Sequence, residues 1–142
     1  VSARTRGLAR FARASAFHGL DRPEDALGEF RSLADDALAA EGQGELAARA
    51  RLMEGEMLFE LGRHAEAIAS FFKVAYGFGD REAPAVFHPW QAQATFEAAR
   101  CCDVLGKPEQ ARGLYAELLD RHPGSPYEAA ARLRLDALNA RK

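Results

Sequence analysis

Apolar side chains recur every three to four residues along most of the chain, which is the spacing that places them on one face of an α-helix. No stretch alternates apolar and polar residues for long enough to form a β-strand. Glycines and prolines separate the helical stretches. The pattern predicts an all-α fold of seven helices, near residues 3–19, 23–40, 44–61, 64–77, 89–105, 108–121 and 126–140.

One eleven-residue motif occurs three times, at residues 20–30, 61–71 and 105–115. Each copy has Leu at its first place, a basic residue at its third, Ala at its seventh and an aromatic residue at its eleventh. Two copies have Gly at the second place, where a left-handed residue closes a helix. The motif predicts two helices that meet at a tight corner, with Ala67 and Ala111 buried against neighbouring helices.

These helix pairs resemble tetratricopeptide repeats. The residues that carry the resemblance are Ala14, Ala26 and Phe30 in the first copy, Gly55, Ala67 and Phe71 in the second, and Ala99, Ala111, Tyr115 and Pro123 in the third. The resemblance implies a right-handed superhelical solenoid of about three helix-turn-helix repeats, near residues 3–41, 44–79 and 89–123, with a capping helix at 126–140. We expect residues 1–142 to form one domain and to be a fragment of a longer chain.

The corners are 41 and 44 residues apart, whereas the usual repeat of the family has 34 residues. The longer interval contains residues 77–90, which are rich in glycine, proline and aromatic residues. Loops of this kind often carry function. Either Phe78, Phe87 and Trp90 fold back onto neighbouring helices, or they bind a partner.

The last helix has a predicted start and a predicted role. Ser125 and Glu128 are spaced as a capping box, with Pro126 in the first turn. We expect the leucines that follow to cover the open end of the solenoid, as terminal repeats must. These leucines are Leu133, Leu135 and Leu138.

The His-Pro-Gly-Ser-Pro-Tyr passage at residues 122–127 also looks like the repeats of bacterial cell-envelope tetratricopeptide proteins. That resemblance favours a periplasmic or outer-membrane-associated location in a bacterium over the cytoplasm. No apolar run approaches the ~20 residues that cross a bilayer, so we expect no membrane span.

The net charge of −2 argues against a general binder of nucleic acid, because such proteins are basic. Residues 1–20 carry four arginines and no acid, which indicates either a solvated helix face or a basic contact patch. The two cysteines, Cys101 and Cys102, are adjacent, and neighbouring helical side chains point about 100° apart. We therefore expect no disulfide, with Cys102 buried and Cys101 more exposed.

No residue pattern is typical of an enzyme. The histidines His18, His64, His88 and His122 lack ligand spacing, so no metal site is expected. Glu56 and Glu60 lie one helical turn apart, with Asp103 as a third carboxylate, and we interpret them as a solvated or groove-lining face rather than an acid–base pair. The phosphate-binding and nucleophile motifs are missing as well. The sequence predicts no catalytic, cofactor-binding or metal-binding residue.

In the resembled family, the first helix of each repeat lines a concave groove. Helical spacing places seven predicted protein-binding residues there: Phe11, Arg49, Leu52, Glu56, Phe59, Phe96 and Arg100. We expect the four apolar members to project into solvent as anchors. The sequence predicts a non-catalytic module that binds a protein or peptide, most suitably an apolar or amphipathic segment. The alternative is a structural or self-associating solenoid within a larger protein, and a homo-oligomer remains open.

Overall fold

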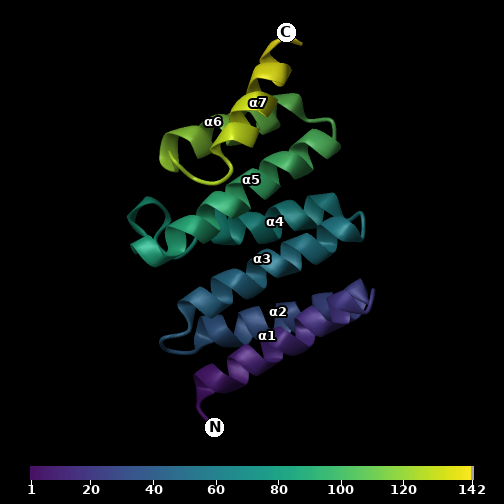
Figure 1. The fold of residues 1–142 in the computed structure, drawn as a ribbon, viewed down its shortest axis with the longest axis vertical. Coiled ribbons are helices and arrows are strands. Elements are labelled where there is room, and N and C mark those ends of the chain that lie inside the picture. Colours follow the sequence, from purple (N-terminus) through teal and green to yellow (C-terminus); the bar gives the residue numbers. More distant parts are fainter. Residues whose placement is uncertain (142) are drawn as a thin grey trace. The chain divides into compact units, whose positions relative to one another are not determined.

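The computed structural model describes residues 1–141 and is all-helical (Figure 1). No β-strand occurs within these residues. The elements are α1 (Ala3–Gly19), α2 (Pro23–Ala39), α3 (Gly44–Glu60), α4 (His64–Ala75), the short 3₁₀ turns η1 (Asp80–Glu82) and η2 (Ala85–Phe87), α5 (His88–Val104), α6 (Pro108–Arg121) and α7 (Glu128–Asn139). The all-α prediction is confirmed, and each predicted α-helix boundary lies within two residues of the observed one.

The helices form two compact units, Val1–Ser70 and Phe71–Lys142, which we call the N-terminal unit and the C-terminal unit. The boundary falls inside α4. In the N-terminal unit α2 packs against both α1 and α3. Its core is built on small and aromatic side chains, including Ala14, Ala26 and Phe30, which are all fully buried. The alanines allow close approach of the helices, and Phe30 fills the space beside them.

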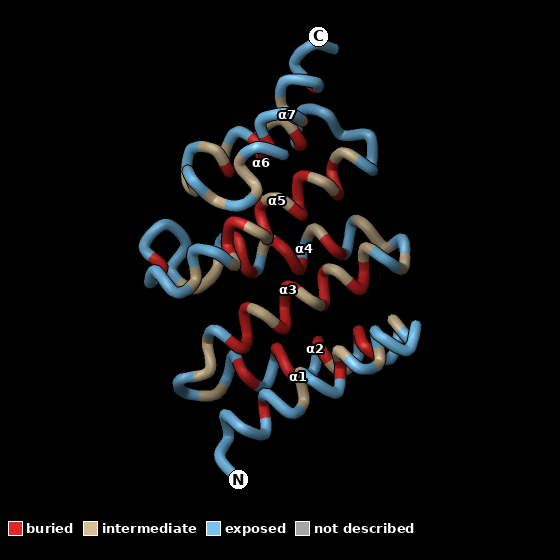
Figure 2. Tube along the Cα trace, in the orientation of Figure 1, coloured by how far each residue is buried: buried red, intermediate tan, exposed pale blue. Residues whose placement is uncertain are grey.

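In the C-terminal unit α6 packs against both α5 and α7. Small side chains of α5 and large side chains of α6 meet there. Ala98, Ala99, Tyr115 and Leu118 are at most 2% exposed. Figure 2 shows the buried positions as stripes along the helices, with exposed positions between them.

The three corners share one hydrogen-bond pattern, which confirms the register of the repeated motif. At the second corner Arg63 N donates to Leu58 O at 2.8 Å, and at the third Lys107 N donates to Cys102 O at 2.9 Å. The first corner has the same bond, from Arg22 N to Phe17 O at 2.9 Å. These are the six-to-one bonds that close a helix through a left-handed residue.

The left-handed residue differs among the corners. Gly62 and Gly106 have φ of 76° and 70°, which glycine adopts without steric cost. The first corner has Asp21 at this place, with φ of 59°. Aspartate tolerates this conformation better than most residues that carry a Cβ atom. Ala67 and Ala111, each five positions after the glycine of its corner, are fully buried as predicted.

The start of α7 differs from the predicted capping box. The helix begins at Glu128, so Ser125 lies outside it and no side chain caps its first residue. Ser125 Oγ instead accepts a hydrogen bond from Tyr127 N at 3.3 Å, and the Glu128 carboxylate accepts one from Gly124 N at 2.7 Å. The same side chains thus stabilise the turn before the helix.

The predicted covering role holds for only part of the leucine set. Leu138 is fully buried, as is Ala131 seven positions before it. Leu133 is 75% exposed and does not cover the core, contrary to expectation. Leu135 is half-buried. Leu133 lies two and five positions from Leu135 and Leu138, which is about 160° and 140° around the helix, so it points away from the face that meets the core.

The prediction for the cysteines is half right. Cys101 and Cys102 form no disulfide with each other. Both are buried, at 0% and 3% exposure, so the expectation of a more exposed Cys101 is wrong. Burial raises the pKa of the Cys102 thiol, which keeps it protonated and weakly nucleophilic.

The segment at residues 77–90 is held by side chains of the following helices. Gln91 Nε2 donates to Gly77 O at 3.2 Å and to Asp80 O at 3.0 Å. Arg121 forms an ion pair with Asp80 at 2.9 Å, and the Arg121 side chain is only 5% exposed. Phe78 and Phe87 stack on each other, with ring centroids 4.6 Å apart, and both remain half-buried. A partner-binding role of this segment stays a prediction.

Candidate functional site: a groove between α5 and α7

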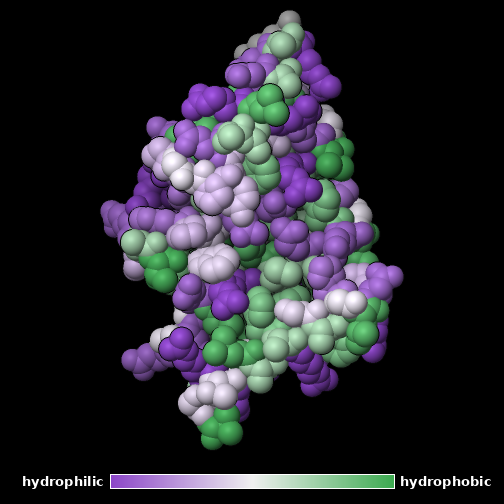
Figure 3. All heavy atoms as spheres, in the orientation of Figure 1, coloured by the Kyte–Doolittle hydropathy of each residue, from purple (hydrophilic) through white to green (hydrophobic). Residues whose placement is uncertain are grey.

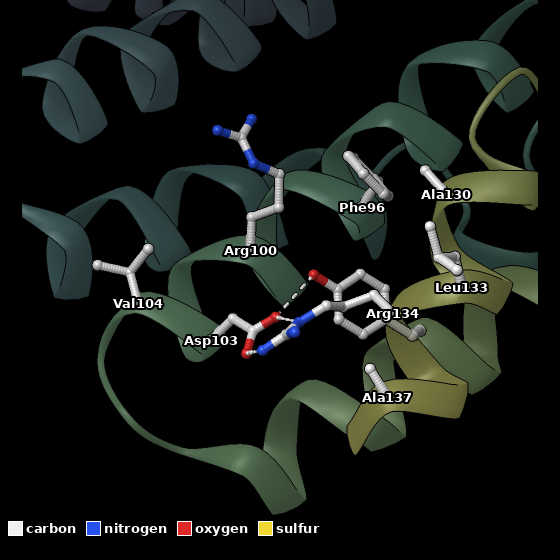
Figure 4. Close-up of a pocket in the computed structure, with 9 residues that line it drawn as sticks. Phe96, Arg100, Asp103, Val104, Ala130, Leu133, Arg134 and Ala137 are labelled. Atoms are coloured by element: carbon white, nitrogen blue, oxygen red, sulfur yellow. Dashed lines mark hydrogen bonds and ion pairs between the residues drawn. The ribbon is translucent and has the colours of Figure 1, made fainter. Parts of the chain in front are cut away.

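A groove with a volume of about 610 Å³ lies between α5 and α7, with one side chain of α6 in its floor (Figure 4). Its lining residues are Phe96, Arg100, Asp103, Val104, Tyr115, Ala130, Leu133, Arg134 and Ala137. On α5 the lining residues stand at positions 96, 100 and 103–104, and on α7 at positions 130, 133–134 and 137, so both sets recur every three to four residues. Each wall is therefore one face of a helix.

The rims of the groove are apolar and open to solvent. Leu133 on α7 is 75% exposed, and Val104 at the end of α5 is 57% exposed. Phe96 is half-buried. Because burial of a side chain of this size is worth roughly 1.5–3 kcal/mol, this surface favours contact with another apolar surface.

The floor is fixed by a carboxylate. Arg134 donates to both oxygens of Asp103, with the Nη2–Oδ1 distance at 2.8 Å, and Tyr115 Oη donates to Asp103 Oδ2 at 3.2 Å (Figure 4). Hydrogen bonding to Arg134 and the positive charge of this guanidinium lower the pKa of Asp103. Burial, followed by the negative charge of Asp103, raises the pKa of Tyr115. The carboxylate stays charged and the phenol neutral, so the bonds persist across physiological pH.

Phe96 is held in a cluster of rings. It stacks on Tyr127 with centroids 5.1 Å apart and meets the edge of Tyr115 at 6.0 Å. Arg100 donates to Glu97 at 2.7 Å on the same helix, and 42% of the Arg100 side chain remains exposed. One wall of the groove thus combines a fixed aromatic ring with an accessible positive charge.

The structure brings two of the seven predicted binding residues, Phe96 and Arg100, into this groove. The other five belong to the N-terminal unit. There Arg49 lies over the ring of Phe11 at 4.6 Å, and Phe11 packs edge-on against Phe30 at 5.2 Å. Phe11 is consequently half-covered by its own unit.

Leu52 is 2% exposed, so the expectation that it projects into solvent as an anchor is wrong. The reason is that α3 is buried on more than one side, with ten of its residues in the core. Phe59 and Glu56, on the same helix, are half-buried. Phe59 lies against His64 with ring centroids 4.7 Å apart.

Sequence reasoning missed six of the groove residues: Val104, Tyr115, Ala130, Leu133, Arg134 and Ala137. Val104 stands at the end of α5, where helical spacing did not assign it to the groove. Tyr115 was recognised only as the aromatic member of the corner motif. Leu133 and Arg134 were obscured by the prediction that the leucines of α7 face the core, although the spacing of those leucines already argued against a single face.

A buried charge cluster in the N-terminal unit was also missed. Glu54 is 2% exposed and accepts hydrogen bonds from Arg31 at 2.7 Å, Arg51 at 3.2 Å and Ser70 at 2.9 Å. Arg51 also pairs with Asp35 at 2.7 Å. Removing one partner of such a cluster leaves a buried charge without compensation, so its role is to hold α2 and α3 together.

Within residues 1–141 no three His, Cys, Asp or Glu side chains gather in a way that could hold a metal ion. Over the same residues no helix is both long enough and apolar enough to cross a membrane.

Comparison with protein families gives a match over most of the chain. Residues 11–86 and 81–126 match the model of the tetratricopeptide repeat. These ranges contain all three copies of the corner motif. No curated protein and no solved structure matches the chain.

Proposed function

The chain belongs to the tetratricopeptide repeat family, and from this premise we propose that it is a non-catalytic interaction module that binds an apolar or amphipathic segment of a partner protein. Repeats of this family generally mediate protein–protein interaction and generally have no catalytic role. What the family does not specify is the place and the chemistry of binding.

One observation carries the proposal: the exposed apolar rims of the groove between α5 and α7. Exposed apolar surface beside a fixed aromatic ring is typical of protein-docking sites. From Phe96 to Val104 the α5 wall spans eight residues, or about 12 Å at 1.5 Å per residue. A groove of this length suits about two turns of a helix with apolar residues on one face.

We further propose Arg49, Glu56 and Phe59 as partner contacts of the N-terminal unit, with Phe11 as a minor one because Arg49 and Phe30 already cover it. Leu52 is withdrawn from this set because it is buried. The charged members set the orientation of a bound segment more than its affinity.

We propose a more specific role for this module in bacterial envelope assembly, which is supported only by the passage at residues 122–127. Fractionation of the native host would test it with an antibody against the chain. Recovery in the periplasm or outer membrane is the expected result, and recovery only in the cytoplasm would overturn it.

The binding proposal can be tested with displayed helical peptides, selected on dilute immobilised protein and then measured by fluorescence anisotropy. Val104→Asp places a charge on the rim and should weaken binding of the selected peptides at least about tenfold. Leu38→Asp is the control, since Leu38 on α2 is an apolar residue of 61% exposure outside the groove. Equal binding by the two variants would exclude the groove as the site.

A further inference from the structure

A second hollow of the C-terminal unit, with a volume of about 400 Å³, lies where the segment at residues 77–90 meets the turn between α6 and α7. Residues 85, 88–89 and 92 line one side of it, and residues 121–126 line the other. It shares no lining residue with the groove between α5 and α7. Its titratable side chains are His88, Arg121 and His122. Three groups that can carry positive charge thus meet at the junction of two segments.

The imidazole of His122 sits in a place that suits its neutral form. Its Nε2 atom is buried and has no hydrogen-bond partner within residues 1–141. A protonated imidazole carries an N–H group on both ring nitrogens. Whichever nitrogen takes the second proton, Nε2–H is then a buried donor without an acceptor, which is costly. The closed packing therefore disfavours protonated His122 on geometric grounds, and burial lowers the pKa of this side chain.

The charges around His122 also oppose a proton. The guanidinium of Arg121 is adjacent in sequence and only 5% exposed, and the ring of His88 lies 6.5 Å away between centroids. Both lower the pKa of His122, whereas Glu117 raises it. The C-terminal end of α6 attracts positive charge, but Arg121 already provides one there. His88 is the first residue of α5, where the positive end of the helix disfavours a second charged imidazole.

The carboxylates of this region are already paired. Arg121 Nη1 contacts Asp80 at 2.9 Å and Glu117 at 3.5 Å. The Glu128 carboxylate, at the start of α7, accepts a hydrogen bond from the backbone of the preceding turn. A protonated His122 would compete with Arg121 for Asp80 and Glu117. Loss of the pair between Arg121 and Asp80 would remove a contact that ties the segment at residues 77–90 to α6.

The segment at residues 77–90 carries backbone strain and apolar surface. Phe78 has φ of 59°, in the left-handed region that is unfavourable for a bulky residue. Its ring stacks on that of Phe87, and the neighbouring Val86 is 49% exposed. In Figure 3 hydrophobic atoms reach the surface among hydrophilic ones where this segment lies, at the left of the view. A strained segment held by a few polar contacts opens at lower cost than the packed helices.

We propose that the segment at residues 77–90 is a pH-sensitive latch: protonation of His122, reinforced by His88, releases it from the turn at residues 121–126 and uncovers the stacked rings of Phe78 and Phe87. Near neutral pH the uncharged imidazole of His122 keeps the latch closed. In acid the open state binds the proton more tightly than the closed state, so the open population rises. This device goes beyond the proposed function, because it controls a surface outside the groove.

Hydrogen exchange followed by mass spectrometry tests the latch at pH 7.5 and pH 5.5, which bracket the ordinary histidine pKa of about 6.5. After correction for the intrinsic pH dependence of exchange, the amides of residues 77–90 should lose protection about three- to tenfold at the lower pH, because the proton shifts the equilibrium by the ratio of its affinities for the two states. The far-UV circular dichroism of the chain should stay the same. Unchanged protection, or a uniform loss over all helices together with loss of the helical signal, would overturn the inference.

Two variants that differ mainly in charge form the matched pair. His122→Gln has no group to protonate and should keep its protection at pH 5.5. His122→Lys is charged at both pH values, since the ordinary pKa of lysine is about 10.4, and should already be open at pH 7.5. A His122→Gln variant that opens in acid like the wild type would contradict the latch. Equal protection of the two variants at pH 7.5 would contradict it as well.

The single tryptophan, Trp90, stands at the end of the segment and gives a second readout. Its emission should change between pH 7.5 and pH 5.5 in the wild type, over the range around the histidine pKa of about 6.5. Release of the segment predicts that this change is absent from His122→Gln. A change of the same size in that variant would assign the signal to His88, two residues away, and would count against the latch.

Discussion

The guanidinium of Arg134 on α7 binds both carboxylate oxygens of Asp103 on α5, across 31 positions of sequence. This pair joins two helices whose own direct contacts are few, since α6 separates much of them. The position of the α7 wall of the groove therefore depends on one ion pair and on the packing of α6.

Asp103→Asn should lower the free energy of unfolding by about 0.5–1 kcal/mol, a value reduced for the solvent exposure of the pair. The pKa of Asp103 is depressed in the folded state, so its contribution is present above the unfolded-state pKa and is lost as pH falls through the folded-state pKa. Urea titrations at pH 7 and at pH 3 would show a smaller difference between wild type and variant at the lower pH. Asp36→Asn is the control, because Asp36 pairs with Arg10 with 64% of its side chain exposed. An equal effect of both substitutions would remove the special role of Asp103.

Ala111→Leu should destabilise the fold by about 1–3 kcal/mol, because a larger side chain cannot fit at a fully buried position without shifting its neighbours. Ala116→Leu on the same helix is exposed and should change stability by less than about 0.5 kcal/mol. Thermal unfolding followed by circular dichroism measures both. Similar melting temperatures for the two variants would mean that the corner motif is not packed as described.

Asp21→Gly should stabilise the chain by up to about 1 kcal/mol, because glycine adopts the positive φ of the first corner without steric cost. The opposite substitution, Gly62→Asp, should destabilise the second corner by a similar amount. Chemical denaturation of both variants provides the measurement. A destabilised Asp21→Gly variant would show that the aspartate side chain contributes more than its backbone conformation costs.

Stability should fall as pH decreases below about 6.5, the ordinary pKa of histidine, through His122. Burial lowers the pKa of His122, and the charge of Arg121 and the nearby His88 lower it further, while Glu117 opposes the shift. Between the folded-state and unfolded-state pKa values the unfolded chain binds more protons, so acidification favours unfolding. His122→Asn should therefore show a smaller drop in melting temperature between pH 7.5 and pH 5.5 than wild type, both chosen to bracket the pKa of about 6.5. A drop in His122→Asn equal to that of the wild type would assign the effect to other groups.

The corners could be predicted because they depend on local features: a left-handed residue, a small residue seven places into the motif and an aromatic residue four places later. All three features act within about three helical turns of chain, so the corner forms without help from residues far away in the sequence. The helix boundaries were accurate for the same reason.

The groove could not be predicted as completely. Helical spacing places Leu52 and Phe59 on one face of α3, yet only Leu52 is in the core, because spacing does not reveal which helices cover each end of a face. Leu133 was assigned to the core for its apolarity alone. The ion pair between Asp103 and Arg134 depends on where α7 lies against α6, which no local pattern encodes.

The division between the floor and the rims of the groove has an evolutionary consequence. Asp103, Tyr115 and Arg134 hold the shape, whereas Val104 and Leu133 are exposed and add little to folding. Substitutions at the rims can therefore accumulate without loss of stability. Descendants of this chain are free to exchange one partner for another while the scaffold beneath them stays the same.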